Sequence, residues 1–175
     1  MKKSIVFLFI LLMAGYINKI SAQIRQEAEI SVNANVLSDL SILSEGDADF
    51  GNLSSTTPGD VFLDPQGIEH SYAGATAIAG KFIITGEGSQ SVRIGWDSSI
   101  TLNGDEDDLT LTFAVSGSGT DSQSGSVDLI ADEGFVTIDL VLNKFYIWVG
   151  GSLGTLTSQA AGNYSGTACF TVEYN

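Results

Sequence analysis

The chain has 175 residues but only one cysteine, Cys169, and one histidine, His70. A single cysteine excludes a disulfide within the chain, and it excludes a zinc site built from cysteines. A single histidine excludes the multi-histidine sites typical of catalytic zinc. A helical hydrophobic period is also missing, and there are only two prolines. Stability must therefore come from a sheet core or from assembly.

Long hydrophobic runs are scarce as well. The longest, residues 5–13, has nine apolar residues, whereas a membrane-spanning helix needs about 20. Lys2 and Lys3 precede this run and Ser21-Ala22 follow it, a pattern typical of a signal peptide over residues 1–22. The alternative is an N-terminal membrane anchor, which the short run disfavours. We expect export to the periplasm, the cell surface or the medium, with no transmembrane segment after cleavage.

Basic residues are few. Residues 23–175 contain four lysines and arginines against all 21 acidic residues, a formal charge of −17. Such a surface repels phosphate backbones, so we expect no nucleic-acid partner. It is compatible with divalent cations or with basic partners.

Alternation of apolar and polar residues is what the chain has in abundance. In residues 28–36, Ala28, Ile30, Val32, Ala34 and Val36 share one face of an expected strand. Similar alternation recurs in residues 78–84, 92–96, 100–102, 109–115, 136–142, 145–149 and 167–174. This pattern predicts one all-β domain over residues 23–175, a sandwich of about eight to ten strands. A closed barrel is the alternative.

Glycines punctuate these strands. Asn103-Gly104 predicts a hairpin, and the Gly/Ser-rich residues 116–126 predict a flexible surface loop. Gly150-Gly151 is expected to break the strand that starts near residue 145, or to form a bulge in it. In the last strand, alternation places Cys169 on the outward face.

One catalytic motif is matched by the residue types but not by the context that its mechanism needs. Residues 150–154 fit G-x-S-x-G around Ser152, but that motif needs a strand-to-helix turn and a histidine later in the chain. His70 comes earlier, in a polar segment where we expect a solvated side chain. We predict no catalytic residues and no enzymatic activity.

Acidic residues cluster in residues 105–108. Asn103, Asp105, Asp107 and Asp108 are candidate calcium ligands, although the spacing lacks the glycine and the glutamate of an EF-hand loop. The alternative is a solvated hairpin tip. No other cofactor is predicted.

Three stretches carry a family resemblance: Asp49-Phe-Gly, the Val-Gly-Gly-x-Leu of residues 149–153, and the Ala-Gly-x-Tyr-x-Gly of residues 161–166. Together they resemble the bacterial domain of unknown function 4402. The resemblance implies an exported immunoglobulin-like β-sandwich, related in style to pilin and spore-coat surface proteins, without a catalytic residue. We expect Gly51 and Gly162 to serve turns and Tyr164 to pack at a sheet corner.

These features favour a non-catalytic structural or accessory subunit of a cell-surface fibre or coat. The expected strand 28–36 could complete the sheet of a like subunit or of another surface protein. For an isolated monomer we favour pairing within its own domain. Candidate assembly residues are Ile30, Val32, Val36 and the penultimate Tyr174.

The alternative function is a secreted carbohydrate- or protein-binding module, with calcium as an optional aid. Loops on a rigid sandwich are where such binding usually lies. Four aromatic residues are candidate contacts, although we expect most of them to pack in the core: Tyr72, Trp96, Tyr146 and Trp148.

Overall fold

The computed structural model describes residue 31, residues 39–132 and residues 134–175. The expected strand 28–36 and the expected signal peptide therefore lie outside the described residues, apart from Ser31. Among the described residues the only helix is a single 3₁₀ turn, η1 (Gln123–Gly125), and no helix has the length and hydropathy of a membrane crossing. Within the described ranges there are ten strands: β1 (Ser41–Gly46), β2 (Asp60–Leu63), β3 (Gly80–Thr85), β4 (Ser91–Trp96), β5 (Ser99–Asn103), β6 (Asp108–Ser118), β7 (Val127–Asp128), β8 (Phe135–Asp139), β9 (Lys144–Thr155) and β10 (Phe170–Tyr174).

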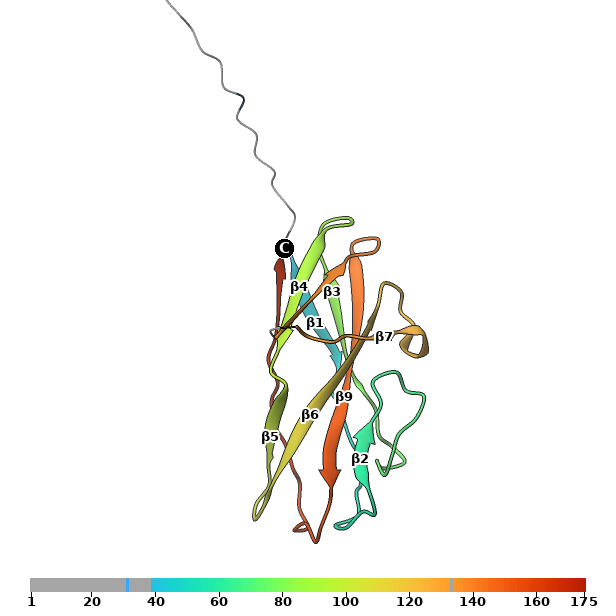
Figure 1. Ribbon diagram of the computed structural model, residues 1–175, viewed down its shortest axis with the longest axis vertical. Coiled ribbons are helices and arrows are strands. Elements are labelled where there is room, and N and C mark those ends of the chain that lie inside the picture. Colours follow the sequence, from blue (N-terminus) through green and yellow to red (C-terminus); the bar gives the residue numbers. More distant parts are fainter. Residues whose placement is uncertain (1–30, 32–38, 133) are drawn as a thin grey trace, which may run out of the picture. The chain divides into compact units, whose positions relative to one another are not determined.

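Seven of these strands form the larger sheet. Its main order is β1-β3-β9-β6-β5, with β2 added to β9 and β7 added to β6. The strand pairs are antiparallel. β9 is the longest strand and lies at the centre of this sheet, between β3 and β6 over its first part and between β2 and β6 over its second (Figure 1).

The smaller sheet has only three strands, in the order β10-β4-β8. Between the two sheets lies a core of residues that alternate along their strands, as the period-two pattern predicts. The larger sheet contributes Ile84 and Ile147 to it, and β4 of the smaller sheet contributes Val92 and Ile94, all four of them fully buried. Phe170 of β10 closes one side, with its ring 5.0 Å from that of Phe82. The prediction of an all-β sandwich is thus confirmed.

The hairpin predicted at Asn103-Gly104 is confirmed. It joins β5 to β6, with Asn103 opposite Asp108 and the Gly104 N–H donating to the carbonyl oxygen of Asp107 at 3.1 Å. The last strand alternates as predicted, and Cys169 is exposed. That strand begins at Phe170 rather than at Thr167.

The surface loop predicted over residues 116–126 begins only after Ser118, and residues 120–125 are mostly exposed, as predicted. β6 continues to Ser118, and the segment after it folds back through η1 onto the outer face of the larger sheet. Ser116 and Ser126 are both buried, and their hydroxyl groups hydrogen bond at 2.8 Å. Composition misled here because small polar side chains can also be buried once they satisfy one another's hydrogen bonds.

Gly150-Gly151 does not break a strand. β9 continues through both residues, and glycine is needed at each because two neighbouring backbones approach too closely for any side chain. A Cβ at Gly150 would lie 2.1 Å from the Leu63 carbonyl oxygen, and one at Gly151 would lie 2.2 Å from that of Thr112. The pairing with β2 shifts register further on, near Leu153. The strand predicted over residues 136–142 also ends earlier, at Asp139, and Leu142 lies exposed in a turn with φ +49°.

Candidate functional site

The two sheets do not cover each other over their whole length. A second hydrophobic cluster lies beyond the three-stranded sheet, and its buried members come from the larger sheet or directly follow it: Val61, Leu109, Leu111, Leu153 and Leu156. No residue of β4, β8 or β10 belongs to this cluster. Residues 47–55 and residues 159–168 face it instead, and neither segment contains a strand.

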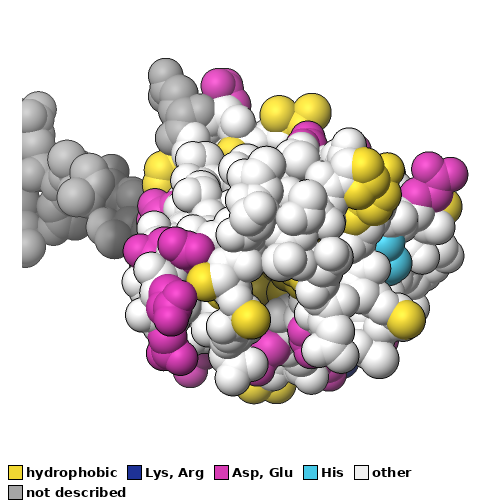
Figure 2. Space-filling view, turned by 90° about the horizontal axis from the view of Figure 1, so that it is seen from below, with side chains coloured by type: hydrophobic (Ala, Val, Ile, Leu, Met, Phe, Trp, Pro, Cys, Tyr) yellow, Lys and Arg dark blue, Asp and Glu magenta, His cyan; other side chains and the backbone are white. Residues whose placement is uncertain are grey.

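Between these two segments and the larger sheet lies a cavity of about 1050 Å³, which we call the interlayer cavity. Ile100 and Leu102 of β5 line it, together with Leu109 and Leu153. The view from below in Figure 2 shows hydrophobic side chains inside a hollow, with acidic side chains nearby and hardly any basic ones. The volume lies slightly above the range of about 300–1000 Å³ usual for ligand sites.

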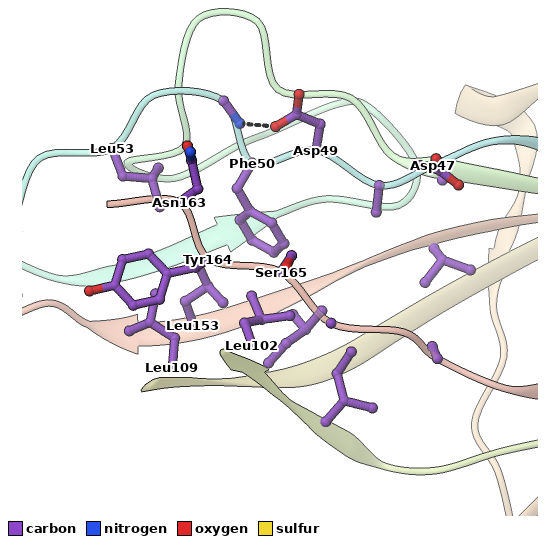
Figure 3. A pocket seen from close by; sticks show the side chains of 18 of the residues that line it. Asp47, Asp49, Phe50, Leu53, Leu102, Leu109, Leu153, Asn163, Tyr164 and Ser165 are labelled. Atoms are coloured by element: carbon purple, nitrogen blue, oxygen red, sulfur yellow. Dashed lines mark hydrogen bonds between the residues drawn. The ribbon is translucent and has the colours of Figure 1, made fainter. Parts of the chain in front are cut away.

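Phe50 reaches into this cavity from a tightly held turn (Figure 3). The Asp49 carboxylate accepts a hydrogen bond from the Gly51 N–H at 2.7 Å, and Gly51 has φ +69°, which favours glycine. The Phe50 carbonyl oxygen accepts from the Gly74 N–H at 2.8 Å, and Asp49 pairs with Ile78. The predicted turn role of Gly51 is confirmed, and the turn aims the Phe50 ring at the larger sheet.

Tyr164, from the segment 159–168, also borders the cavity (Figure 3). Its hydroxyl donates a hydrogen bond to the Ala160 carbonyl oxygen at 2.8 Å, and its ring packs on the second cluster. A tyrosine hydroxyl bonded to the backbone a few residues upstream is the feature called a tyrosine corner. The predicted corner role of Tyr164 is confirmed. Gly162 lies in a bend, as expected.

The calcium candidates do not form a cluster. The Asp107 carboxylate accepts from the Ala160 N–H at 3.0 Å, and that of Asp108 accepts from the Gly104 N–H at 3.4 Å. Asp105 is exposed at the hairpin tip, and the Asn103 backbone pairs with Ser165. Among the described residues, no three acidic, histidine or cysteine side chains converge as a metal site would require. Asp107 instead fastens the hairpin to the segment that borders the cavity.

Ser152 lies inside β9, where its hydroxyl accepts a hydrogen bond from the Gly154 N–H at 3.0 Å. The nucleophile elbow requires a strand-to-helix turn, which β9 does not provide here. His70 is exposed, as predicted, but it is not simply solvated, because its Nδ1 accepts a hydrogen bond from the Asp64 N–H at 3.1 Å.

Asp64 organises the loop that carries His70. Its carboxylate accepts hydrogen bonds from the N–H groups of Gln66, Ile68 and Glu69 at 2.8–2.9 Å. Partial burial acts to raise the pKa of Asp64, but the hydrogen bonds, that from Glu69 first, outweigh it and hold this pKa below its usual value.

The four candidate aromatic contacts lie in different places. Trp148 is buried on the outer face of the larger sheet and stacks on Tyr146, with ring centroids 6.3 Å apart. Trp96 stacks on Phe170, with ring centroids 5.9 Å apart. Tyr72 alone of the four is more than half exposed, at 51%, and it has φ +53°. Packing is thus the main role of most of these aromatics, as expected.

Of the candidate assembly residues, Ile30, Val32 and Val36 lie outside the described residues. Tyr174 lies in β10 opposite Val92, where its hydroxyl accepts a hydrogen bond from the Glu87 N–H at 2.7 Å. Its ring packs against the core between the sheets. The penultimate aromatic residue therefore anchors the chain end within its own domain.

Sequence reasoning noted Phe50 and Tyr164 but did not foresee the cavity that both border. The alternation of Leu109, Leu111 and Phe113 in the first half of β6 predicted a buried face there, but not which element would cover it. The fold and the site define an all-β sandwich domain whose smaller sheet leaves part of the larger sheet uncovered. The chain belongs to the family described as a domain of unknown function (DUF4402), which it matches over residues 40–174. No curated protein matches it.

Proposed function

We propose that this protein is a non-catalytic, exported structural or accessory subunit of a cell-surface fibre or coat. The observation that carries the proposal is the uncovered half of the larger sheet. Its apolar residues face a cavity bordered by segments without strands, which is where an added strand from another molecule would be stabilised. The signal-peptide pattern of residues 1–22 supports export.

The chemistry of the cavity supports a binding role over a catalytic one. On the side of the larger sheet its lining is mainly aliphatic and aromatic, whereas polar residues and glycines predominate on the two irregular segments. The nearby Asp49 carboxylate is engaged with the Gly51 backbone. An extended polypeptide offers such a site two things at once: apolar side chains for the sheet, and backbone hydrogen bonds for the bordering segments.

Electron microscopy and size-exclusion chromatography of the purified exported protein test the proposal, together with microscopy of the producing cells. We expect concentration-dependent multimers, and fibres or a coat on the cells. Leu102→Asp places a charge in the cavity, and Thr101→Asp places the same charge on the exposed face of the same strand. Assembly should be lost only in the former, with circular dichroism confirming that both are folded. Monodisperse monomers at every concentration, with bare cells, would contradict the proposal.

The second candidate function is a secreted carbohydrate- or protein-binding module. The half-exposed Tyr72, together with the nearby loop that Asp64 organises, favours it, since an exposed aromatic ring next to a rigid loop is a common binding element. A glycan array probed with and without calcium is the direct test. Binding that Tyr72→Ala abolishes would support this role, and no binding in either condition would count against a carbohydrate ligand.

A further inference from the structure

The lining of the interlayer cavity indicates what kind of segment would fit in it. One side is apolar, formed by Leu102, Leu109 and Leu153 of the larger sheet. The two irregular segments border the other side with their backbone, with polar residues and with the rings of Phe50 and Tyr164 (Figure 3). A strand whose apolar residues all share one face fits this lining, because alternate side chains would point at the sheet and the others at solvent.

We propose that the occupant is residues 28–36 of a second copy of this chain, an inference that rests on the proposed function. In this run Ala28, Ile30, Val32, Ala34 and Val36 alternate with the polar side chains at 27, 29, 31, 33 and 35. The apolar face would pack on the larger sheet, and the polar face would be exposed to solvent on the side that the smaller sheet does not cover.

The lengths agree. Along β9 and just beyond, the lining runs from Val149 to Leu156, seven residue steps or about 23 Å of strand. The eight steps from residue 28 to residue 36 span about 26 Å when extended. Val149 belongs to the core between the sheets, whereas Leu153 and Leu156 belong to the second cluster, so the run is long enough to reach from the edge of that core across the cavity.

Backbone partners for such a strand lie at the border of the cavity. Among the described residues, the segment 159–169 bridges to Asn103 through Ser165 and donates from the Gln159 N–H to the Ser55 carbonyl oxygen. In residues 47–55, Asp49 bridges to Ile78 and the Phe50 carbonyl oxygen accepts from the Gly74 N–H, and other backbone groups of both segments take no part in these bonds. The first of these segments leads directly into β10, an edge strand of the smaller sheet. An inserted strand would extend this three-stranded sheet over the second cluster.

The chain end and the cavity lie at opposite ends of the domain (Figure 1), which favours insertion into a second copy. Leu40 and Tyr174 meet at Gly86, where a Cβ would lie 2.9 and 2.7 Å from their side chains. In Figure 1 the C-terminus lies at the top, whereas the β5–β6 hairpin and the chain after β9, which border the cavity, lie at the bottom. A segment that precedes one end of a domain and enters the other end of its neighbour makes a head-to-tail contact, which repeats into a filament.

Disulfide cross-linking of the full exported chain tests the occupant. In a Cys169→Ser background, Ala168→Cys places a thiol in the cavity lining, and a second thiol is placed by Ile30→Cys, Val32→Cys or Ala34→Cys. Ser31→Cys and Asn33→Cys serve as controls on the opposite face. We expect mild oxidation to give covalent dimers and larger multimers, with a yield several-fold higher for at least one apolar-face position than for the controls. Cross-links confined to single chains at every concentration, or equal yields on both faces, would overturn the proposal.

A synthetic peptide of residues 28–36 supplies a second measurement. The full chain carrying Ile30→Asp and Val32→Asp should stay monomeric, bind this peptide and unfold at a higher temperature in its presence. Ser31→Asp with Asn33→Asp should still assemble. Fibres that form equally well with Ile30→Asp and Val32→Asp would overturn this occupant and leave the proposed function standing. Peptide binding with intermolecular cross-links, in a protein that never forms fibres, would support the occupant and remove the fibre role.

Discussion

Lys81 Nζ lies 2.8 Å from a carboxylate oxygen of Asp121, and this ion pair ties β3 to the segment after β6 across the outer face of the larger sheet. Glu45 of β1 holds the same ammonium group at 2.8 Å. Beneath it lie the rings of Tyr146 and Trp148, with centroids 5.4 and 5.9 Å from Nζ. The hydrogen bonds to Asp121 and then to Glu45 raise the pKa of Lys81 above its ordinary value.

Replacing Lys81 with methionine should therefore lower the free energy of unfolding by about 1 kcal/mol near neutral pH, because the pairs are partly exposed. The folded pKa is raised, so this contribution is complete below the unfolded pKa of about 10.4 and is lost as pH rises through the folded value. Urea unfolding of both proteins at pH 7 and at pH 11 checks this. Lys144→Met, at an exposed position, is the control, and an equal loss there would contradict the assignment.

The stability that Asp64 contributes should depend on pH in the opposite direction. Asp64→Asn should cost about 1 kcal/mol at pH 7, because the three backbone N–H groups would lose a charged acceptor. Its folded pKa is lowered, so the stabilisation is present above the unfolded pKa of about 3.9 and is lost as pH falls through the folded value. The difference between the two proteins in denaturant unfolding should shrink at acid pH. It should be absent throughout for Glu69→Gln, an exposed neighbour, and a difference independent of pH would refute the role of the charge.

Gly151 tests the close approach of backbones inside the larger sheet. Gly151→Ala should destabilise the fold by about 2 kcal/mol or more, because the added methyl group would overlap the Thr112 carbonyl oxygen, which belongs to the backbone of β6. Gly162→Ala, at a position with open space, should change stability by less than about 0.5 kcal/mol. Thermal unfolding of both variants provides the comparison. Equal melting temperatures would show that β9 tolerates a side chain there.

A substitution at Tyr164 tests whether its hydrogen bond stabilises the segment that borders the cavity. Tyr164→Phe removes the hydrogen bond to the Ala160 carbonyl oxygen and should lower the free energy of unfolding by about 1 kcal/mol. Amide hydrogen exchange should quicken in residues 159–166 more than in the core strands. Tyr72→Phe, which changes a half-exposed ring, is the matched control. Uniform acceleration across the domain would mean that Tyr164 supports the whole fold rather than this segment.

Local patterns predicted most strands but not where each one ends. The alternation of Val92, Ile94 and Trp96 fitted β4 because each side chain's face follows directly from its position in the strand. Leu142 continued the apolar alternation of its strand but lies exposed in a turn, since β8 and β9 need a connection there. Ser116 and Ser126 looked like loop residues and are buried, because each satisfies the other's hydroxyl group.

The interlayer cavity was beyond the reach of such patterns. An alternating run tells which side chains of a strand are buried, but not which element buries them. Phe50 and Tyr164 are more than 100 residues apart in the chain and meet the same cluster only because the larger sheet brings them to one end of the domain.

The sequence alone is enough to show an acidic, all-β chain without a disulfide within it, and to show which side chains share a face in most of its strands. These properties depend on composition and on the period of two, which are local. Only the tertiary structure decided that seven strands form one sheet and three form the other, so that part of the larger sheet is left for residues 47–55 and 159–168 to border. The physical reason is that the division of strands between sheets depends on long-range backbone pairing, which no local period encodes.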